Sequence, residues 1–248
     1  MNLNLNTKAL HHYNDKDHAV ESARPVVQYI ISILENKPSN VVDIGCGLAQ
    51  WLCAFKEYGI NEVLGIDGSH VPIDRLNIEE SEFKSYNLQE LTFESIGKRF
   101  DLLLCLEVVE HLEEEYAHKF IQTLTKLSDV IIFSAAVPHQ TGENHFNEQY
   151  PDYWENIFKQ FDYSFLDPFR EKFWQDENIP WWYSQNMFLV VKSDLKHNYD
   201  FPYNGNIYIH PKLLELQAST NQNFYKTSST RQKIKSMIKS ILKKVGVL

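Results

Sequence analysis

Short runs of apolar residues alternate along the chain with longer stretches in which apolar residues recur every three or four positions. The short runs predict buried strands, and the longer stretches predict amphipathic helices. Strands that alternate with helices are typical of a mostly parallel sheet covered by helices, so we expect an α/β fold. The expected strands cover residues 40–44, 62–67, 82–86, 100–106, 129–134, 163–166 and 185–192, and the expected helices cover residues 24–35, 48–58, 70–78, 113–127 and about 151–161.

The chain of 248 residues is long enough for one main domain and a short appendage. We expect this domain in residues 1–192, with capping helices at its start and a polar loop at residues 134–154 that binds the acceptor. Residues 193–230 are rich in asparagine and predict an irregular connector. Residues 231–248 predict a basic amphipathic helix, which could lie on an anionic membrane, pack against an acidic body or stay disordered.

The distribution of charge limits the partners of the domain. Residues 231–248 hold six basic residues and no acidic one, so the rest of the chain carries a formal charge of −15, against −9 for the whole chain. Because so acidic a body repels a phosphate backbone, we expect no nucleic-acid partner. The sequence leaves the oligomeric state open.

Cysteine usage and hydropathy indicate a compartment. Cys46, Cys53 and Cys105 lie in apolar contexts, where cysteine acts as a small hydrophobic residue, and this favours a reducing environment. The sequence shows neither a signal-peptide pattern nor an apolar run of about 20 residues that would span a bilayer. We therefore expect a cytoplasmic protein, placed at the inner membrane surface if its tail binds lipid.

The stretch NVVDIGCG, residues 40–47, ends a predicted strand with an acid and begins a helix with two glycines. A tight glycine turn lets the main chain approach a ligand and points N–H groups at it. Asp67 follows at the end of the next predicted strand, 22 residues after Gly45, where a carboxylate accepts hydrogen bonds from both hydroxyls of a ribose. The pattern predicts a nucleoside site.

Two features of this turn distinguish between nucleoside cofactors. A dinucleotide site normally has a third glycine in the pattern G-x-G-x-x-G, where this chain has Gln50. Asp43 also places a carboxylate where it would repel a pyrophosphate and attract an ammonium group. S-adenosylmethionine has such an ammonium group and no phosphate, so we favour it over a nicotinamide dinucleotide, which remains the competing cofactor.

Three ordered motifs, VVDIGCGLA, VLGIDGS and FDLLLCLEVVEHL, resemble those of class I S-adenosylmethionine-dependent methyltransferases, and the resemblance covers residues 24–192. It implies a Rossmann-like class I methyltransferase fold: a mostly parallel, doubly wound sheet with an antiparallel last strand and helices on both faces. It also implies S-adenosylmethionine as donor and S-adenosylhomocysteine as product. The residues that it implies for cofactor binding are Asp43, Gly45, Cys46, Gly47, Asp67, Gly68, Asn87, Leu88, Leu106 and Glu107.

Two of these motif positions depart from the family pattern. Asn87 stands where relatives often have aspartate against the adenine, which leaves that contact to an amide oxygen. Ala49 replaces a frequently seen glycine, and we expect little effect from that change.

Histidines near the ends of two predicted strands are candidates for a catalytic base. Methyl transfer needs an aligned acceptor, and a hydroxyl acceptor benefits from a base that titrates near neutral pH. His145 in the loop 134–154 is the first candidate, followed by His139 in the same loop and His111 after the strand at 100–106. The alternative for His111 is a residue that orients neighbouring carboxylates. We expect no metal site.

Three later segments, NHFNEQYPDYWENIF, IPWWYSQNMFLVV and YIHPKLLE, resemble methyltransferases encoded with bacterial surface-polysaccharide genes. This resemblance implies O-methylation of a hydroxyl on a sugar, a nucleotide-sugar or another small polar precursor of a capsule or surface glycan. Two alternatives remain. The acceptor could be a phosphate or phosphoramidate oxygen of a capsule precursor, which needs no base, or the protein could be a non-catalytic nucleoside-binding subunit of a partner enzyme.

Overall fold

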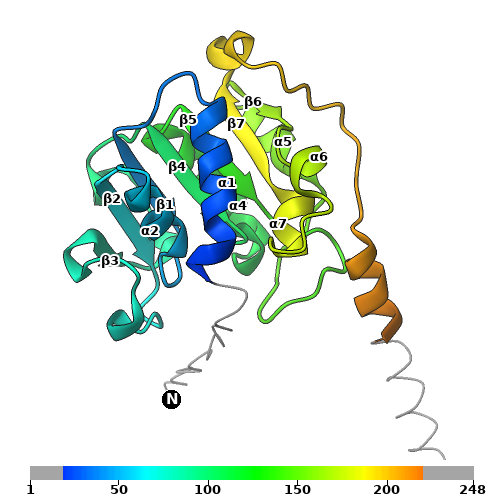
Figure 1. The fold of residues 1–248 in the computed structure, drawn as a ribbon, viewed down its shortest axis with the longest axis horizontal. Coiled ribbons are helices and arrows are strands. Elements are labelled where there is room, and N and C mark those ends of the chain that lie inside the picture. Colours follow the sequence, from blue (N-terminus) through cyan, green and yellow to red (C-terminus); the bar gives the residue numbers. More distant parts are fainter. Residues whose placement is uncertain (1–18, 220–248) are drawn as a thin grey trace, which may run out of the picture. The chain divides into compact units, whose positions relative to one another are not determined.

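The computed structural model describes residues 19–219, and a seven-stranded sheet forms its centre (Figure 1). The strand order is β3-β2-β1-β4-β5-β7-β6; β1 to β5 pair in parallel, and β7 lies antiparallel between β5 and β6. This topology confirms the predicted Rossmann-like fold with an antiparallel last strand. The strands are β1 Asn40–Ile44, β2 Glu62–Asp67, β3 Phe83–Ser85, β4 Leu102–Leu106, β5 Val130–Ser134, β6 Tyr163–Leu166 and β7 Phe188–Lys192.

The helices divide between the two faces of the sheet and build a separate apolar core on each. Helices α1, α2, α6 and α7 pack on one face, and α3, α4 and α5 pack on the other. Figure 1 shows α1 across the near face of the sheet. The α-helices are α1 Val20–Ile33, α2 Gln50–Glu57, α3 Phe93–Ile96, α4 Glu114–Leu127, α5 Pro151–Lys159, α6 Arg170–Phe173 and α7 Trp181–Asn186. Short 3-10 helices are η1 Ile73–Arg75, η2 Glu80–Glu82, η3 Leu88–Glu90, η4 Val109–His111 and η5 Ser193–Asn198.

The central strand β4 belongs to both cores, because successive side chains of a strand point to opposite faces. Leu102, Leu104 and Leu106 lie in the core beneath α1, and Leu103 and Cys105 lie in the core beneath α4. All five side chains are at most 6% exposed. Burial on both faces explains the uninterrupted apolar run in the sequence. The residues that follow β4 are therefore fixed between two packed layers.

Helix α1 begins earlier than the sequence pattern predicted. It begins at Val20 rather than at residue 24, so Pro25 lies inside the helix instead of in its first turn. The proline removes only one backbone hydrogen bond near the helix start. Arg24 holds this end in place, since its guanidinium pairs with Glu57 of α2 at 2.6 Å and with Glu21 at 3.1 Å.

The segment 185–192, expected as one strand, splits into the end of α7 and the strand β7. Pro180 precedes the first turn of α7, and the Met187 N–H donates to the Tyr183 carbonyl at 3.1 Å to close the last turn. Gln185 and Asn186 consequently lie in a helix, and both are buried. The apolar period of the sequence did not separate a short buried helix from a strand.

The predicted irregular connector is partly helical. It begins with η5, and residues 211–219 form a further helix. Residues 199–208 pack on the domain through Arg170, which donates to the Asn206 carbonyl at 3.0 Å and lies 4.4 Å from the ring centroid of Tyr208. The predicted basic tail, residues 231–248, lies outside the described residues. No helix within residues 19–219 has the length and apolar character needed to cross a bilayer.

We expect Leu104→Ala to destabilise the domain strongly, because the side chain is fully buried in the central strand. Truncation of a buried leucine typically costs about 2–5 kcal/mol in the free energy of unfolding. Ile73→Ala is the control, since Ile73 is 46% exposed, and its cost should stay within about 0.5 kcal/mol. Urea denaturation measures both. Equal costs for the two variants would contradict this assignment of the core.

Candidate active site

The glycine turn after β1 passes close to the chain that follows β4. Gly45 has φ of +79°, and a Cβ at this position would overlap the side chain of Val108. Gly47 has φ of +53°, also in the left-handed region that glycine enters at little cost. Ala49 adopts φ of +61°, so the glycine that it replaces would have fitted with less strain. The positive φ therefore indicates a cost in backbone strain at Ala49, which our expectation of little effect did not include.

The N–H groups of this turn are satisfied inside the protein. Gly45 and Cys46 donate to the Ile66 carbonyl at 2.7 and 3.3 Å, and Gly47 donates to the Asp67 carboxylate at 2.7 Å. The expectation that these N–H groups face a ligand was wrong for all three, because the parallel pairing of β1 and β2 brings the end of β2 beneath the turn. A pyrophosphate needs such donors, so this arrangement disfavours a dinucleotide.

Two buried carboxylates lie at the ends of β1 and β2. Asp67 accepts hydrogen bonds from the N–H groups of Gly47 and Gly68 at 2.7 and 2.6 Å, which fix its orientation. Asp43 is 1% exposed, and its Oδ2 has no hydrogen-bond partner among residues 19–219. Burial raises the pKa of Asp43, and the nearby Asp67 raises it further. A ligand that brings positive charge to Asp43 would remove this cost, so the site fits a cationic donor.

The other predicted cofactor residues follow strands at the same edge of the sheet. Gly68 follows β2, Leu106 ends β4, and Asn87 precedes η3, which begins at Leu88. The carboxyl ends of parallel strands form the edge at which open α/β sheets bind ligands. The Asn87 side-chain oxygen accepts from the Gln89 N–H at 3.2 Å, so this amide also caps η3.

Glu107 is held at the end of β4 by two amide side chains from distant parts of the chain. Gln140 donates to its carboxylate at 2.8 Å and Asn186 at 3.1 Å. The backbone of Glu107 has φ of +55°, and its N–H donates to the Ser134 carbonyl at 3.1 Å. Burial raises the pKa of Glu107 to about 7. These bonds fix the carboxyl group at the end of β4.

Glu110 connects the end of β4 to the predicted acceptor loop. Its carbonyl accepts from the N–H groups of Phe146 and Asn147 at 2.7 and 3.0 Å. Its side chain is fully buried, and neither carboxylate oxygen has a hydrogen-bond partner among the described residues. Burial raises the pKa of Glu110 well above its usual range, and the negative charge of Glu107 raises it further. The N–H groups of Glu110 and Ala136 oppose this effect without forming well-aligned hydrogen bonds.

Two histidines come together beside Glu110. The rings of His111 and His145 lie 4.8 Å apart, centroid to centroid, at 85°. His111 Nδ1 is 3.3 Å from the Asn144 carbonyl, and His145 Nδ1 is 2.8 Å from Glu148 Oε1. Both partners are acceptors, so the neutral tautomer that satisfies each contact has its proton on Nδ1 and its lone pair on Nε2. One ring nitrogen of each histidine and one oxygen of Glu110 lie within 4.8 Å of one another.

Glu148 organises the loop that carries His145. Its carboxylate accepts from the N–H groups of His139 and Thr141, each at 2.8 Å, and from His145. His139, Thr141 and Asn144 all have positive φ, at +71°, +59° and +60°. Strained backbone of this kind persists where surrounding contacts hold it, often at functional sites. The ring of His139 is exposed and does not belong to the group formed by Glu110, His111 and His145.

Sequence reasoning found the histidines and Glu107 but assigned no separate role to four polar residues that lie beside them or orient them. These residues are Glu110, Gln140, Glu148 and Asn186. The spacing Glu107-x-x-Glu110-His111 was visible in the sequence and could have indicated a polar cluster after β4. The amides carried no such signal, because folding alone brings Asn186 to Glu107 from 79 residues away.

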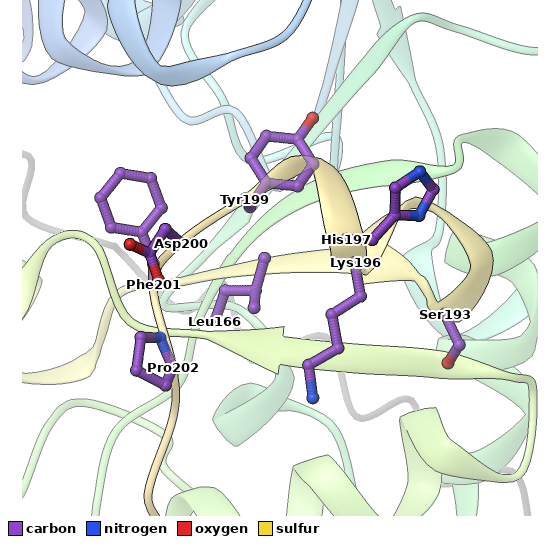
Figure 2. Close-up of a pocket in the computed structure, with 8 residues that line it drawn as sticks. All are labelled: Leu166, Ser193, Lys196, His197, Tyr199, Asp200, Phe201 and Pro202. Carbon is purple, nitrogen blue, oxygen red and sulfur yellow. The ribbon is translucent and has the colours of Figure 1, made fainter.

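A hollow of about 460 Å³ lies elsewhere on the domain and shares no residue with this site. Figure 2 shows that β6, η5 and the chain after η5 line it, with the rings of Tyr199 and Phe201 along one side. The lining is mostly apolar and contains no member of the histidine cluster. The lining residues are Leu166, Ser193, Lys196, His197, Tyr199, Asp200, Phe201 and Pro202.

We expect Gly45→Ala to destabilise the domain more than Gly97→Ala does. Both glycines have positive φ, but a Cβ at residue 97 meets no atom within 4 Å, whereas one at residue 45 overlaps Val108. Gly97→Ala should cost about 1–2 kcal/mol from backbone strain alone. The double variant Gly45→Ala/Val108→Ala should recover part of the additional loss. Urea denaturation tests this, and equal losses for the two single variants would contradict the close approach.

Comparison with known proteins agrees with this geometry. A family model described as a methyltransferase domain matches residues 16–183. The small RNA 2′-O-methyltransferase of Arabidopsis thaliana is 27% identical over 193 residues, which cover 72% of this chain and 20% of that protein. The mitochondrial ubiquinone biosynthesis O-methyltransferase of Dictyostelium discoideum is 30% identical over 102 residues, or 36% of this chain and 31% of that protein.

The chain spans about a fifth to a third of these relatives. Among solved structures, an O-methyltransferase family protein from Burkholderia thailandensis matches with a TM-score of 0.51 and 11% identity, covering 70% of this chain and 56% of that chain. This structural match supports the fold, and the family model identifies the kind of domain. The chain belongs to the methyltransferase domain family, which confirms the predicted class of S-adenosylmethionine-dependent methyltransferases.

Proposed function

We propose that the protein transfers a methyl group from S-adenosylmethionine to a hydroxyl oxygen of a small polar acceptor such as a sugar or a nucleotide-sugar. The observation that carries this proposal is the position of the cluster Glu110, His111 and His145 beside the donor turn. Gly45 of that turn packs on Val108, only two residues before Glu110. Groups that can activate a hydroxyl thus lie next to the turn predicted to bind the donor.

The residues of the donor side match the charges of S-adenosylmethionine. The donor supplies a methyl group on a positively charged sulfur, and the acceptor oxygen displaces that sulfur, which keeps the electron pair of the broken bond. Asp67, fixed by two N–H groups, is suited to accept hydrogen bonds from ribose hydroxyls. The unpartnered oxygen of Asp43 is suited to the ammonium group.

The acceptor side favours a hydroxyl over a phosphate. Glu107, Glu110 and Glu148 gather three carboxylates there, in a body with a formal charge of −15 before the tail. Without a bound cation, a phosphate oxygen placed among these carboxylates as the accepting atom would meet repulsion. The two curated relatives are named for O-methylation, which supports oxygen as the accepting atom.

Two exposed aromatic side chains on the acceptor loop are consistent with a sugar. Phe146 is 65% exposed and Tyr150 is 39% exposed, and the Phe146 N–H is bonded to the Glu110 carbonyl. Aromatic rings at the mouth of a site provide apolar surface for a sugar ring, while the nearby polar groups orient its hydroxyls. The same exposed rings could also stack with a nucleotide-sugar base.

Donor binding is tested by calorimetry with S-adenosylhomocysteine and with NAD. We expect S-adenosylhomocysteine to bind and NAD not to bind. Asp67→Ala should weaken S-adenosylhomocysteine binding at least about tenfold, or about 1.4 kcal/mol, because ribose loses its acceptor. Asp74→Ala, on the short helix η1, is the matched control and should bind like the unchanged protein. Preferential binding of NAD would contradict the proposal.

Acceptor chemistry is tested by incubating the full chain with isotope-labelled S-adenosylmethionine and a panel of sugars and nucleotide-sugars. We expect one acceptor to gain one labelled methyl group by mass spectrometry. The deoxy analogue that lacks the modified hydroxyl should gain none. Transfer to a phosphate oxygen, or donor binding with no transfer to any hydroxyl compound in extracts of the source cells, would contradict O-methylation of a hydroxyl.

A further inference from the structure

We propose that Glu110, His111 and His145 bind a divalent transition-metal ion. One oxygen of Glu110 and one ring nitrogen of each histidine lie within 4.8 Å of one another. The residues come from two segments, η4 after β4 and the loop after β5, that the hydrogen bonds from Phe146 and Asn147 to Glu110 hold together. The site is thus assembled by the fold rather than by one local stretch of sequence.

The side chain of Glu110 is the first observation that points to a cation. It is fully buried, and both of its oxygens lack hydrogen-bond partners among the described residues. A buried carboxylate without partners is costly in folding free energy as an ion, because it loses its hydration and gains no opposite charge. A metal ion bound between this carboxyl group and the two histidines would supply the missing positive charge.

The orientation of the two histidines is the second observation. Metal-binding histidines usually donate their other ring N–H to a carboxylate or a backbone carbonyl, which fixes the ring and its tautomer. His111 faces the Asn144 carbonyl with Nδ1, and His145 faces the Glu148 carboxylate with Nδ1. We therefore assign Nε2 of both rings as the ligand atoms. Glycine at position 142 also leaves room for the His145 ring, since a Cβ there would overlap the imidazole.

The chemistry of the ligands indicates which ions fit. Two imidazoles and one carboxylate suit first-row transition metals such as Mn²⁺, Co²⁺ or Zn²⁺, whereas Mg²⁺ and Ca²⁺ prefer oxygen ligands throughout. Ligand bonds of about 2.0–2.2 Å require neighbouring ligand atoms at roughly 3 to 3.5 Å. The present group must therefore close slightly around the ion. Movement of the loop that carries His145 would allow this closure.

Nearby charges would strengthen the binding of a cation without serving as ligands. The Glu107 carboxylate is bonded to Gln140 and Asn186, and the Glu148 carboxylate is bonded to two backbone N–H groups and to His145. Both remain close enough to raise the pKa of Glu110 by their negative charge. Three protein ligands would leave coordination positions open, as catalytic metal sites do.

The consequence for catalysis rests on the proposed function. A divalent ion bound by these residues would lower the pKa of an acceptor hydroxyl beside it, so that the hydroxyl proton could pass to solvent water as the oxygen forms its bond to the methyl carbon. The carbon–sulfur bond breaks at the same time, and the sulfur keeps both electrons. In this scheme His145 is a metal ligand and does not act as the base that the sequence predicted.

Metal binding is tested with full-length protein that carries no histidine tag and has been treated with a chelator. Titration calorimetry with Mn²⁺ should show one site, and Mg²⁺ should bind at least about tenfold more weakly. Co²⁺ bound at the site should give visible absorption bands that differ in position and intensity from those of Co²⁺ in buffer. Glu110→Gln and His145→Ala should abolish the Mn²⁺ site, and Glu148→Gln should weaken it about 10–100-fold, since Glu148 only orients His145.

His118→Ala is the matched control, because this histidine lies on α4, where it hydrogen-bonds to Gln160 and contacts the ring of Phe161, and it does not belong to the cluster. It should bind Mn²⁺ like the unchanged protein. Each variant should also retain S-adenosylhomocysteine binding, which shows that the domain is folded. No Mn²⁺ binding to the unchanged protein, or equal binding to Glu110→Gln, would overturn the metal site. Mn²⁺ binding without transfer to any hydroxyl would leave the metal site standing and contradict only the proposed function.

Discussion

The proposed ligand sites depend on carboxylates that are buried at one edge of the sheet. Some of the oxygens of these carboxylates have no hydrogen-bond partner among the described residues. Asp43 and Glu110 each keep buried oxygens with no hydrogen-bond partner among the described residues, and burial raises the pKa of both. Isolated buried charge is costly, so such groups are retained where a ligand provides the opposite charge. The two acids follow β1 and β4, which are neighbours in the sheet. Both the donor and the proposed metal ion would bring positive charge to this edge.

The architecture explains why the acids can be held in this way. The central strand β4 is packed on both faces, so Glu107 and Glu110 emerge from a rigid layer rather than from a free loop. Gly45 of the glycine turn packs against Val108. The N–H groups of the turn donate to Ile66 and Asp67 at the end of β2. The turn therefore allows a close approach of the main chain, while the carboxylates favour a ligand with positive charge. A phosphate-binding turn differs, because its N–H groups donate to the ligand.

The parts of the fold that depend on local patterns could be predicted from the sequence, and those that depend on distant contacts could not. The strand Tyr163–Leu166 and the run ending at Leu106 were predicted closely, because buried strands carry continuous or alternating apolar residues. The start of α1 was missed because its first turn is stabilised by Arg24 pairing with α2. Residues 185 and 186 were misassigned because a one-turn buried helix has no distinct period. The cluster of Glu110 with His145 joins segments that the pairing of β4 with β5 and the bonds from Phe146 and Asn147 to Glu110 bring together.

A crystal structure of the full chain grown with S-adenosylhomocysteine and Mn²⁺ is the most direct test of the claim that this edge binds positively charged ligands. We predict the ribose of S-adenosylhomocysteine on Asp67 and its ammonium group facing Asp43. We also predict an anomalous peak of manganese within bonding distance of Glu110, His111 and His145. A ligand that leaves Asp43 unpartnered, together with no anomalous peak at the cluster, would contradict this claim.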